Sequence, residues 1–111
     1  MKMFNIQIED RVLVAEGRLM KSCRKMFKKR QFFLFNDILV YGTVSRKQTI
    51  FALEDIKLES LEDEDDHQYK NGFWICTKGK SFAVYADTPS DKQNWMNYIN
   101  KVKILKIAFA K

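Results

Sequence analysis

Short hydrophobic stretches alternate with polar turns along most of the chain, and this pattern predicts β-strands. Branched and aromatic residues concentrate in segments of the length typical of strands. The expected strands are residues 12–20, 31–35, 38–44, 49–53, 56–61, 73–77 and 81–85. Polar and apolar side chains also alternate from Phe4 to Ile8, so residues 1–11 fit either an extra strand or an N-terminal extension.

Three polar connections separate the expected strands. Asn36-Asp37 is a two-residue link whose side chains tolerate positive φ, as tight hairpins require. Residues 45–47 form a polar loop, and residues 78–80 are Lys-Gly-Lys, a turn between the last two strands. The connections therefore predict antiparallel neighbours.

The period of the pattern changes after residue 87, which predicts one amphipathic helix. Thr88 can cap a helix, Pro89 suits its first turn, and Asp91 favours its positive end. The apolar positions that follow recur at intervals of three and four: Trp95, Ile99, Val102, and then Leu105 or Phe109. Seven strands and one helix indicate a mainly β fold, a small barrel or orthogonal sandwich plugged by the helix.

Length and composition limit the class of protein. The chain has 111 residues, 46% of them hydrophobic, which suits one domain with a real core. Its longest apolar run, residues 82–86, falls far short of the roughly 20 residues of a membrane span. Residues 1–11 lack the apolar stretch of a secretory signal. We therefore expect a cytoplasmic protein.

The net charge of +6 comes from one short segment. Residues 21–30 contain no acid, and the rest of the chain has fourteen basic residues against fourteen acidic ones. The cations of this basic segment are Lys21, Arg24, Lys25, Lys28, Lys29 and Arg30. Such a cluster favours phosphate groups, because Arg and Lys make charge-assisted hydrogen bonds to them. A solvated basic loop and a nuclear-import patch are the alternatives.

Other polar groups indicate neither catalysis nor a bound metal. The acidic run at residues 59–66 lacks the central Gly and closing Glu of a calcium loop and fits an exposed loop. Cys23 and Cys76 have no zinc-type spacing, and His67 lies in the acidic loop with no nucleophile nearby in sequence. We therefore expect no enzyme, no metal and no cofactor.

The chain resembles a pleckstrin homology (PH) domain. The motifs that carry the resemblance are EGRLMK at 16–21, KRQFFLFNDILVYG at 29–42, KSFAVYA at 80–86, and WMN at 95–97 in the terminal helix. They look most like the Phafin type, which pairs this domain with a zinc-binding FYVE domain on endosomal membranes. Similar domains occur in FYVE-bearing exchange factors for Rho-family GTPases. The two cysteines here are too few for a FYVE domain within this chain.

The resemblance implies a seven-stranded barrel of two near-orthogonal antiparallel sheets, capped by a C-terminal helix. The PH domain would span residues 12–105, with residues 106–111 as the helix end or a tail. The loops after strands one, three and six would surround an open end that binds phosphoinositide headgroups. The expected site residues are Lys21, Arg24, Lys25, Lys28, Lys29, Arg30, Tyr41, Arg46 and Lys47, with Lys78 and Lys80 nearby. Tyr41 also fits an ordinary barrel aromatic.

Met26 and Phe27 are two large apolar residues flanked by cations. They fit either insertion into the headgroup region of a membrane or packing back onto the barrel. We expect a peripheral module on endosomal or plasma membrane that binds phosphoinositide lipids. The alternative is a protein-interaction module beside an exchange-factor domain, with a small GTPase as partner. Nucleic acid is not expected, because no exposed aromatic stacking face is identified.

Overall fold

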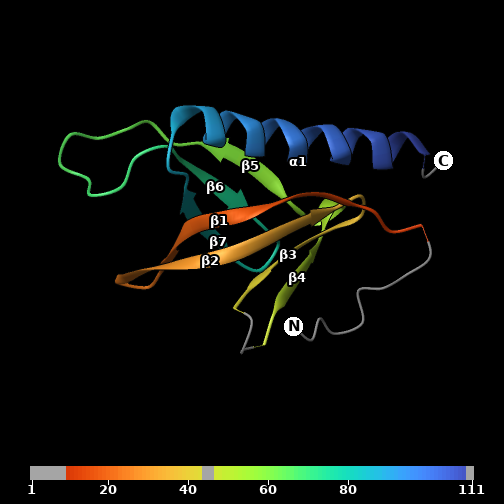
Figure 1. Cartoon of the computed structure of the whole chain (residues 1–111), viewed down its shortest axis with the longest axis horizontal. Coiled ribbons are helices and arrows are strands. Elements are labelled where there is room, and N and C mark those ends of the chain that lie inside the picture. The colour runs from red at the N-terminus through yellow and green to blue at the C-terminus, as the bar shows by residue number, and fades with distance from the viewer. Residues whose placement is uncertain (1–9, 44–46, 110–111) are drawn as a thin grey trace.

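The computed structural model describes residues 10–43 and 47–109, and shows an antiparallel sheet covered on one side by a helix (Figure 1). The elements are β1 Leu13–Cys23, β2 Met26–Phe35, β3 Ile38–Gly42, β4 Thr49–Ala52, the 3-10 helix η1 Leu53–Asp55, β5 Lys57–Ser60, β6 Gly72–Cys76, β7 Ser81–Tyr85 and α1 Pro89–Phe109. The strands lie in the order β4-β3-β2-β1-β7-β6-β5. The mainly β class with a C-terminal helix is confirmed.

Helix α1 begins where the sequence predicts. The backbone N–H of Asp91 donates to Thr88 Oγ1 at 3.0 Å, so Thr88 caps the helix and satisfies one of its free donors. Trp95, Ile99 and Val102 are buried on one face. Leu105 is 46% exposed, which ends the buried stripe at Val102 within the described side chains. The side chain of Phe109 lies outside the described part.

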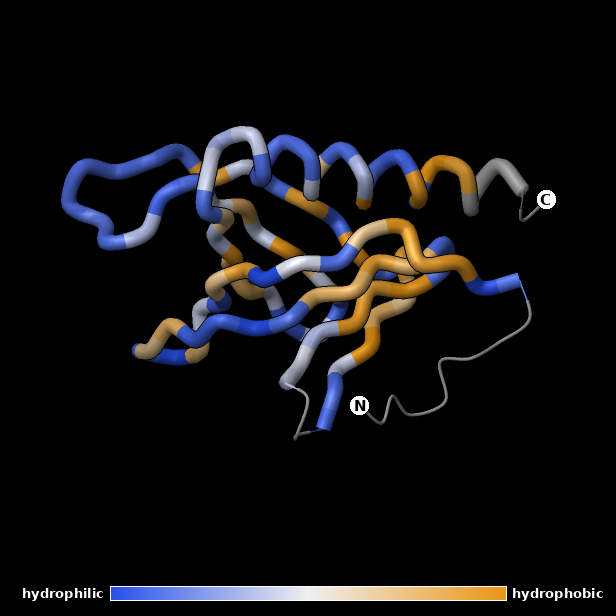
Figure 2. Tube along the Cα trace, in the orientation of Figure 1, coloured by the Kyte–Doolittle hydropathy of each residue, from blue (hydrophilic) through white to orange (hydrophobic). Residues whose placement is uncertain are grey.

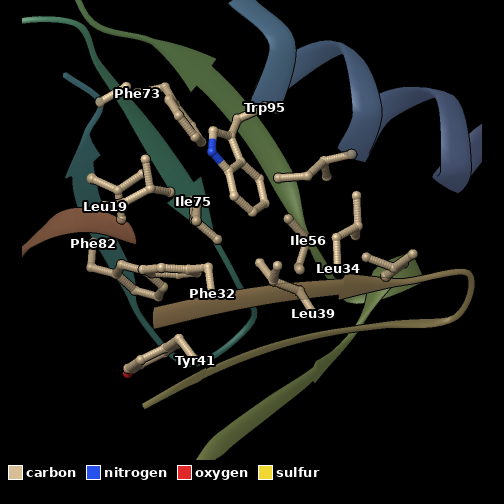
Figure 3. Packing of buried hydrophobic residues seen from close by; sticks show 14 of the residues in the cluster. Leu19, Phe32, Leu34, Leu39, Tyr41, Ile56, Phe73, Ile75, Phe82 and Trp95 are labelled. Atoms are coloured by element: carbon tan, nitrogen blue, oxygen red, sulfur yellow. The ribbon is translucent and has the colours of Figure 1, made fainter. Parts of the chain in front are cut away.

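The hydrophobic core lies between the sheet and α1 (Figure 3). Phe32, Phe73 and Ile75 are fully buried beside Trp95, and each large side chain removed from water contributes about 1.5–3 kcal/mol. Gly17 lets the indole of Trp95 approach β1, because a Cβ there would lie 3.3 Å from Trp95 Cζ2. The helix is therefore fixed against the sheet by the aromatic side chain that the sequence singled out.

The two-residue link between β2 and β3 is confirmed, but its expected positive φ is wrong. Among the described non-glycine residues, positive φ occurs at Asp10, Arg24 and Asn71. Asn36 and Asp37 serve instead through their side chains. Asn36 Oδ1 accepts from the N–H of Val12 at 3.0 Å, and the Arg11 guanidinium binds Asp37 through both carboxylate oxygens. The link thereby ties the start of β1 to this turn.

The hairpin of β1 and β2 is longer than expected. The predicted strands left residues 21–30 between them, but only Arg24 and Lys25 form the turn, with Arg24 at φ 57°. The strand ladder continues through the pairs Lys21↔Lys28 and Cys23↔Met26. In Figure 2 the hairpin changes from hydrophobic near the core to mostly hydrophilic toward its tip. This part of β2 buries little, so its sequence carries no clear strand alternation.

Four other strands, β3 to β6, differ from their predicted bounds by one or two residues, β6 being shifted by one. β3 ends at Gly42, and Val44 lies outside the described part. β4 ends at Ala52 because Leu53 turns inward to be fully buried and opens η1, its N–H donating to the Asp37 carbonyl at 3.1 Å. β5 comprises residues 57–60 only, paired with β6. The turn at residues 78–80 is confirmed.

The acidic loop, residues 61–71 between β5 and β6, folds toward the outer face of the hairpin. Phe27 lies 4.7 Å from the ring of Tyr69 and 5.8 Å from His67 and from Tyr85, centroid to centroid. The acids at positions 62–66 stay exposed. Burial, and then the charge of Glu64, raise the pKa of Tyr85. The acidic loop therefore packs aromatic side chains against Phe27 and keeps its acids on the surface.

Candidate anion-binding site

A basic hollow of about 250 Å³ opens between three hairpins, and we call it the inner hollow. The β1–β2 hairpin, the β3–β4 connection and the β6–β7 connection each supply part of its wall. The lining residues are Lys21, Cys23, Lys28, Arg30, Tyr41, Gly42, Thr43, Lys47 and Lys80. Five of them are cations and none is an acid, so within the described residues the wall favours an anion.

Lys21 is the buried cation of the inner hollow. Only 8% of it is exposed, because it follows Leu19 on the core-facing side of β1. Its Nζ donates to the Ser22 carbonyl at 3.2 Å and lies 4.7 Å from the ring centroid of Phe82. No described carboxylate pairs with it. A buried ammonium is costly unless it is paired, so this group is ready to receive an anion.

Strand alternation divides the predicted cations into two sets. Lys21 pairs with Lys28 across the ladder, and Arg30 lies two residues further along β2 on the same face. Lys29 pairs with Met20 on the opposite face and does not line the inner hollow. Arg24 and Lys25 are exposed in the turn, also away from the wall. The structure therefore brings together half of the six cations of the basic segment.

Tyr41 fits both roles predicted for it, an aromatic residue of the barrel core and a residue of the site. Its ring stacks on Phe32 at 5.2 Å and on Phe51 at 6.0 Å, and Lys21 Nζ lies 5.2 Å from its centroid. Figure 3 shows it at the border of the core with its hydroxyl directed away from Trp95. It lines the inner hollow while 8% exposed, so its ring belongs to the core and its edge to the site.

The remaining predicted cations divide in the same way. Lys47 and Lys80 line the inner hollow, and Arg46 lies outside the described residues. Lys78 does not line the inner hollow, and its Nζ lies 3.4 Å from Asp55 Oδ1. No acid of residues 62–66 lines the inner hollow.

Met26 and Phe27 separate although they are adjacent. Met26 is 58% exposed beside the tip of the hairpin, whereas Phe27 packs against Tyr69 and the acidic loop. Successive side chains of a strand point to opposite faces, which explains the difference. Phe27 has therefore taken the packed position, and Met26 alone stays accessible for contact with a membrane.

Sequence reasoning missed Cys23, Gly42 and Thr43, which also line the inner hollow. Thr43 Oγ1 is buried and has no hydrogen-bond partner among the described groups. Thr43 follows Tyr41 by two positions, so the alternation of β3 was a signal that could have found it. At Gly42 a Cβ would lie 2.9 Å from Gln48 Cγ, so only glycine lets the chain approach so closely there.

The described residues contain no group of three or more His, Cys, Asp or Glu side chains arranged to hold a metal ion. No described helix is long and apolar enough to cross a membrane.

The antiparallel sheet, its C-terminal helix and the basic hollow between three hairpins define a class of small binding modules. The chain matches the PH domain family over residues 13–103 and belongs to that family. It is 52% identical over 102 residues to pleckstrin homology domain-containing family F member 2 of Homo sapiens. That match covers 86% of this chain and 40% of the relative, so the chain spans about two-fifths of the relative's length.

Solved structures share the fold. The C-terminal PH domain of pleckstrin in complex with D-myo-Ins(1,2,3,5,6)P5 is 26% identical, with a TM-score of 0.69 and coverage of 83% of this chain and 96% of that one. The DH/PH domain of human ARHGEF11, in a ternary complex with RhoA and its inhibitor, is 21% identical with a TM-score of 0.67. That match covers 84% of this chain and 29% of the other, and it shows likeness of fold alone.

Proposed function

We propose that this chain is a non-catalytic module that binds phosphoinositide headgroups in the inner hollow and recruits its host protein to membrane. The observation that carries the proposal is Lys21, a buried cation without a carboxylate partner among the described residues. Lys28 and Arg30 stand beside it on the same face, and Tyr41 and Thr43 offer hydroxyls. A phosphorylated inositol ring supplies several anionic groups to such a set.

The strength of binding follows from the number of cations. Each cation near an anionic surface contributes about 1 kcal/mol, and screening by salt reduces this. Micromolar binding requires roughly 8 kcal/mol. Surface attraction alone therefore falls short, and the direct contacts of Lys21 and Arg30 with headgroup phosphates supply the difference. Pleckstrin's C-terminal PH domain, which has an inositol phosphate in its solved complex, supports the same chemistry here.

Resemblance to Phafin-type domains extends the proposal to the host protein. We assign the module to residues 12–105 and place its host on endosomal or plasma membrane as a peripheral protein. The match to family F member 2 covers two-fifths of that relative's length. We therefore also propose that the host protein carries a FYVE domain outside the matched part. Arg46 would join the site from the β3–β4 connection, and Arg24, Lys25 and Lys29 would add attraction to the anionic surface.

A protein-interaction role beside an exchange-factor domain is the second candidate. The DH/PH structure in complex with RhoA favours it only through the shared fold. The inner hollow favours lipid, because its wall holds five cations and no acid. The two roles differ in one requirement: the lipid role fails without anionic lipid, and the protein role fails without a GTPase or exchange-factor partner.

Charge reversal in the inner hollow tests the lipid role. Lys21→Glu combined with Arg30→Glu is expected to abolish sedimentation with vesicles that contain phosphoinositides, across a panel of mono-, bis- and tris-phosphorylated lipids. The matched control reverses two exposed cations outside the hollow, Lys57→Glu with Lys101→Glu. Circular dichroism checks that both variants fold. Undiminished binding by the folded double variant would refute the site.

A further inference from the structure

Cys23 and Cys76 are both free thiols, and of the two only Cys23 lines the inner hollow. Cys23 is exposed at the end of β1, next to the turn of the hairpin. It follows Lys21 by two positions, so both side chains lie on the same face of the strand, about 6.6 Å apart along it. An accessible sulfur therefore lies in the wall that holds five cations.

Other groups of this wall lack hydrogen-bond partners. Lys21 is 8% exposed, and its one hydrogen bond among the described residues goes to the Ser22 carbonyl. An ammonium has three N–H donors, so two of them have no described partner. Thr43 Oγ1 is also buried, and no described group hydrogen-bonds to it. Buried polar groups cost free energy until they are paired, so these groups indicate an anionic occupant independently of the thiol.

Cys76 offers a comparison within the same chain. It lies on β6, is half-buried, and does not line the inner hollow. Its cross-strand neighbours are Lys57 and Ser81, so one cation lies directly beside it. Reactive cysteines are typically accessible and surrounded by cations, whereas buried ones are inert. The two thiols therefore differ in access and in the number of cations around them.

The charge of the inner hollow selects the reagents that reach Cys23. Five cations and no acid line the wall, so a reagent with carboxylates is attracted to it and a cationic one is repelled. A cleft lined by one sign of charge raises the association rate of an oppositely charged molecule by about 10–10³-fold. A disulfide that carries carboxylates would therefore meet the Cys23 sulfur more often than a cationic disulfide of similar size.

We propose that Cys23 is a modification site, where the disulfide of an anionic low-molecular-weight thiol forms a mixed disulfide that occupies the inner hollow. The Cys23 thiol gives its proton to water, and its sulfur attacks one sulfur of the reagent. The S–S bond of the reagent breaks, one half becomes bonded to Cys23, and the other half leaves as a thiolate. Cys23 is thereby oxidised, and the departing half is reduced.

The bonded half would bring its carboxylates to Lys21 and Lys28, where headgroup phosphates are proposed to bind. Modification would therefore switch off lipid binding, and a reducing thiol would restore it by the reverse exchange. This regulatory consequence rests on the proposed function. The preference of Cys23 for an anionic reagent depends only on the cations of the wall.

Rates of modification test the site. The variants Cys76→Ser and Cys23→Ser each leave one thiol, and circular dichroism checks that both fold. Each is treated with anionic glutathione disulfide and with cationic cystamine, mass spectrometry follows the adduct, and rates are divided by those of N-acetylcysteine. Cys23 is expected to favour the anionic reagent by about tenfold or more, and less in high salt. Cys76 is expected to show a much smaller preference, because one exposed cation attracts weakly.

Calorimetry with a soluble inositol polyphosphate tests the consequence. Glutathione-modified Cys76→Ser protein is expected to bind at least about tenfold more weakly, the worth of one lost charge-assisted hydrogen bond, and to recover with dithiothreitol. Methylthiolation of Cys23 is the matched control, because it adds a small neutral group, and it is expected to cost clearly less affinity. Conversely, the polyphosphate is expected to slow modification of Cys23 and to leave the rate at Cys76 unchanged.

The outcomes separate the two proposals. No anionic preference at Cys23, or an equal one at Cys76, would overturn the modification site. Unchanged affinity after modification would overturn its regulatory role. Reduced protein that binds no inositol polyphosphate would refute the proposed function instead, and the anionic preference of Cys23 would still be expected.

Discussion

Lys21 is buried in the core-facing layer although it carries a charge. Its neighbours are the rings of Tyr41 and Phe82 and one backbone carbonyl. Cation–π contacts contribute about 0.5–2 kcal/mol, less than the cost of fully removing an ammonium from water. The residue therefore lowers the stability of the free protein in order to present a partly desolvated charge to a ligand, a trade that binding sites commonly make.

Lys21→Met tests this trade at a single residue. Methionine keeps the length and packing of the side chain and removes the charge, so the free energy of unfolding is expected to rise by about 1 kcal/mol. Affinity for soluble inositol phosphate is expected to fall at least tenfold, the worth of one charge-assisted hydrogen bond of about 1.5–3 kcal/mol. Urea unfolding and calorimetry measure the two effects.

Lys25→Met is the matched control, because Lys25 is exposed in the turn and does not line the inner hollow. It is expected to leave both quantities within experimental error of the wild type. A destabilised Lys21→Met protein that binds inositol phosphate normally would show that Lys21 is structural.

Tyr85 reports on the acidic loop. Tyrosines of the unfolded chain ionise near pH 10. Because the pKa of Tyr85 is raised in the folded protein, its phenol stays protonated at that pH. The corresponding stabilisation is fully present below pH 10 and is lost as the pH rises through the pKa of the folded state. Absorbance titration is expected to show a phenol that ionises late and is absent in Tyr85→Phe.

Glu64→Gln removes the smaller of the two causes of that shift. The pKa of the late phenol is therefore expected to fall part of the way toward 10, while burial keeps it above that value. An unchanged titration curve would mean that the acidic loop does not lie over Tyr85 in solution.

At the scale of elements, the sequence prediction was most accurate where burial imposes a regular spacing of apolar residues. The buried stripe of α1, the Thr88 cap and strand β7 are as expected, because each faces the core on a regular spacing. The length of the β1–β2 hairpin was underestimated, because residues 26–29 pair only with β1 and are too little buried to show a strand pattern in the sequence. Position along the chain showed the cation cluster, but the register of β1 and β2 decides which cations share a face.

The contact between hairpin and acidic loop depends on Phe27. Phe27→Ala is expected to speed hydrogen exchange at residues 26–29 and 61–71 by about fivefold or more, because Tyr69 and His67 lose their apolar partner. Met26→Ala, on the exposed face, is expected to leave exchange unchanged. Equal protection in both variants would show that the acidic loop is held by other contacts.

Over the whole molecule, charge is polarised rather than simply positive. Basic side chains gather at the inner hollow, and the exposed acids of residues 62–66 lie on the loop that packs against Phe27 on the other face of the hairpin. Such a distribution gives the domain a dipole that turns the hairpin toward an anionic surface. The sequence showed the basic segment and the acidic run. The contact of Phe27 with the acidic loop, which holds the two apart, depends on tertiary packing and could not be predicted from the sequence.

The most direct measurement of the central claim is an amide NMR titration of the wild-type chain with a soluble inositol polyphosphate. Binding in the inner hollow predicts the largest saturable shifts at Lys21, Lys28 and Arg30, with Thr43 following, and small shifts in the acidic loop. Absence of saturable shifts at these positions, or shifts confined to the acidic loop and α1, would contradict the account.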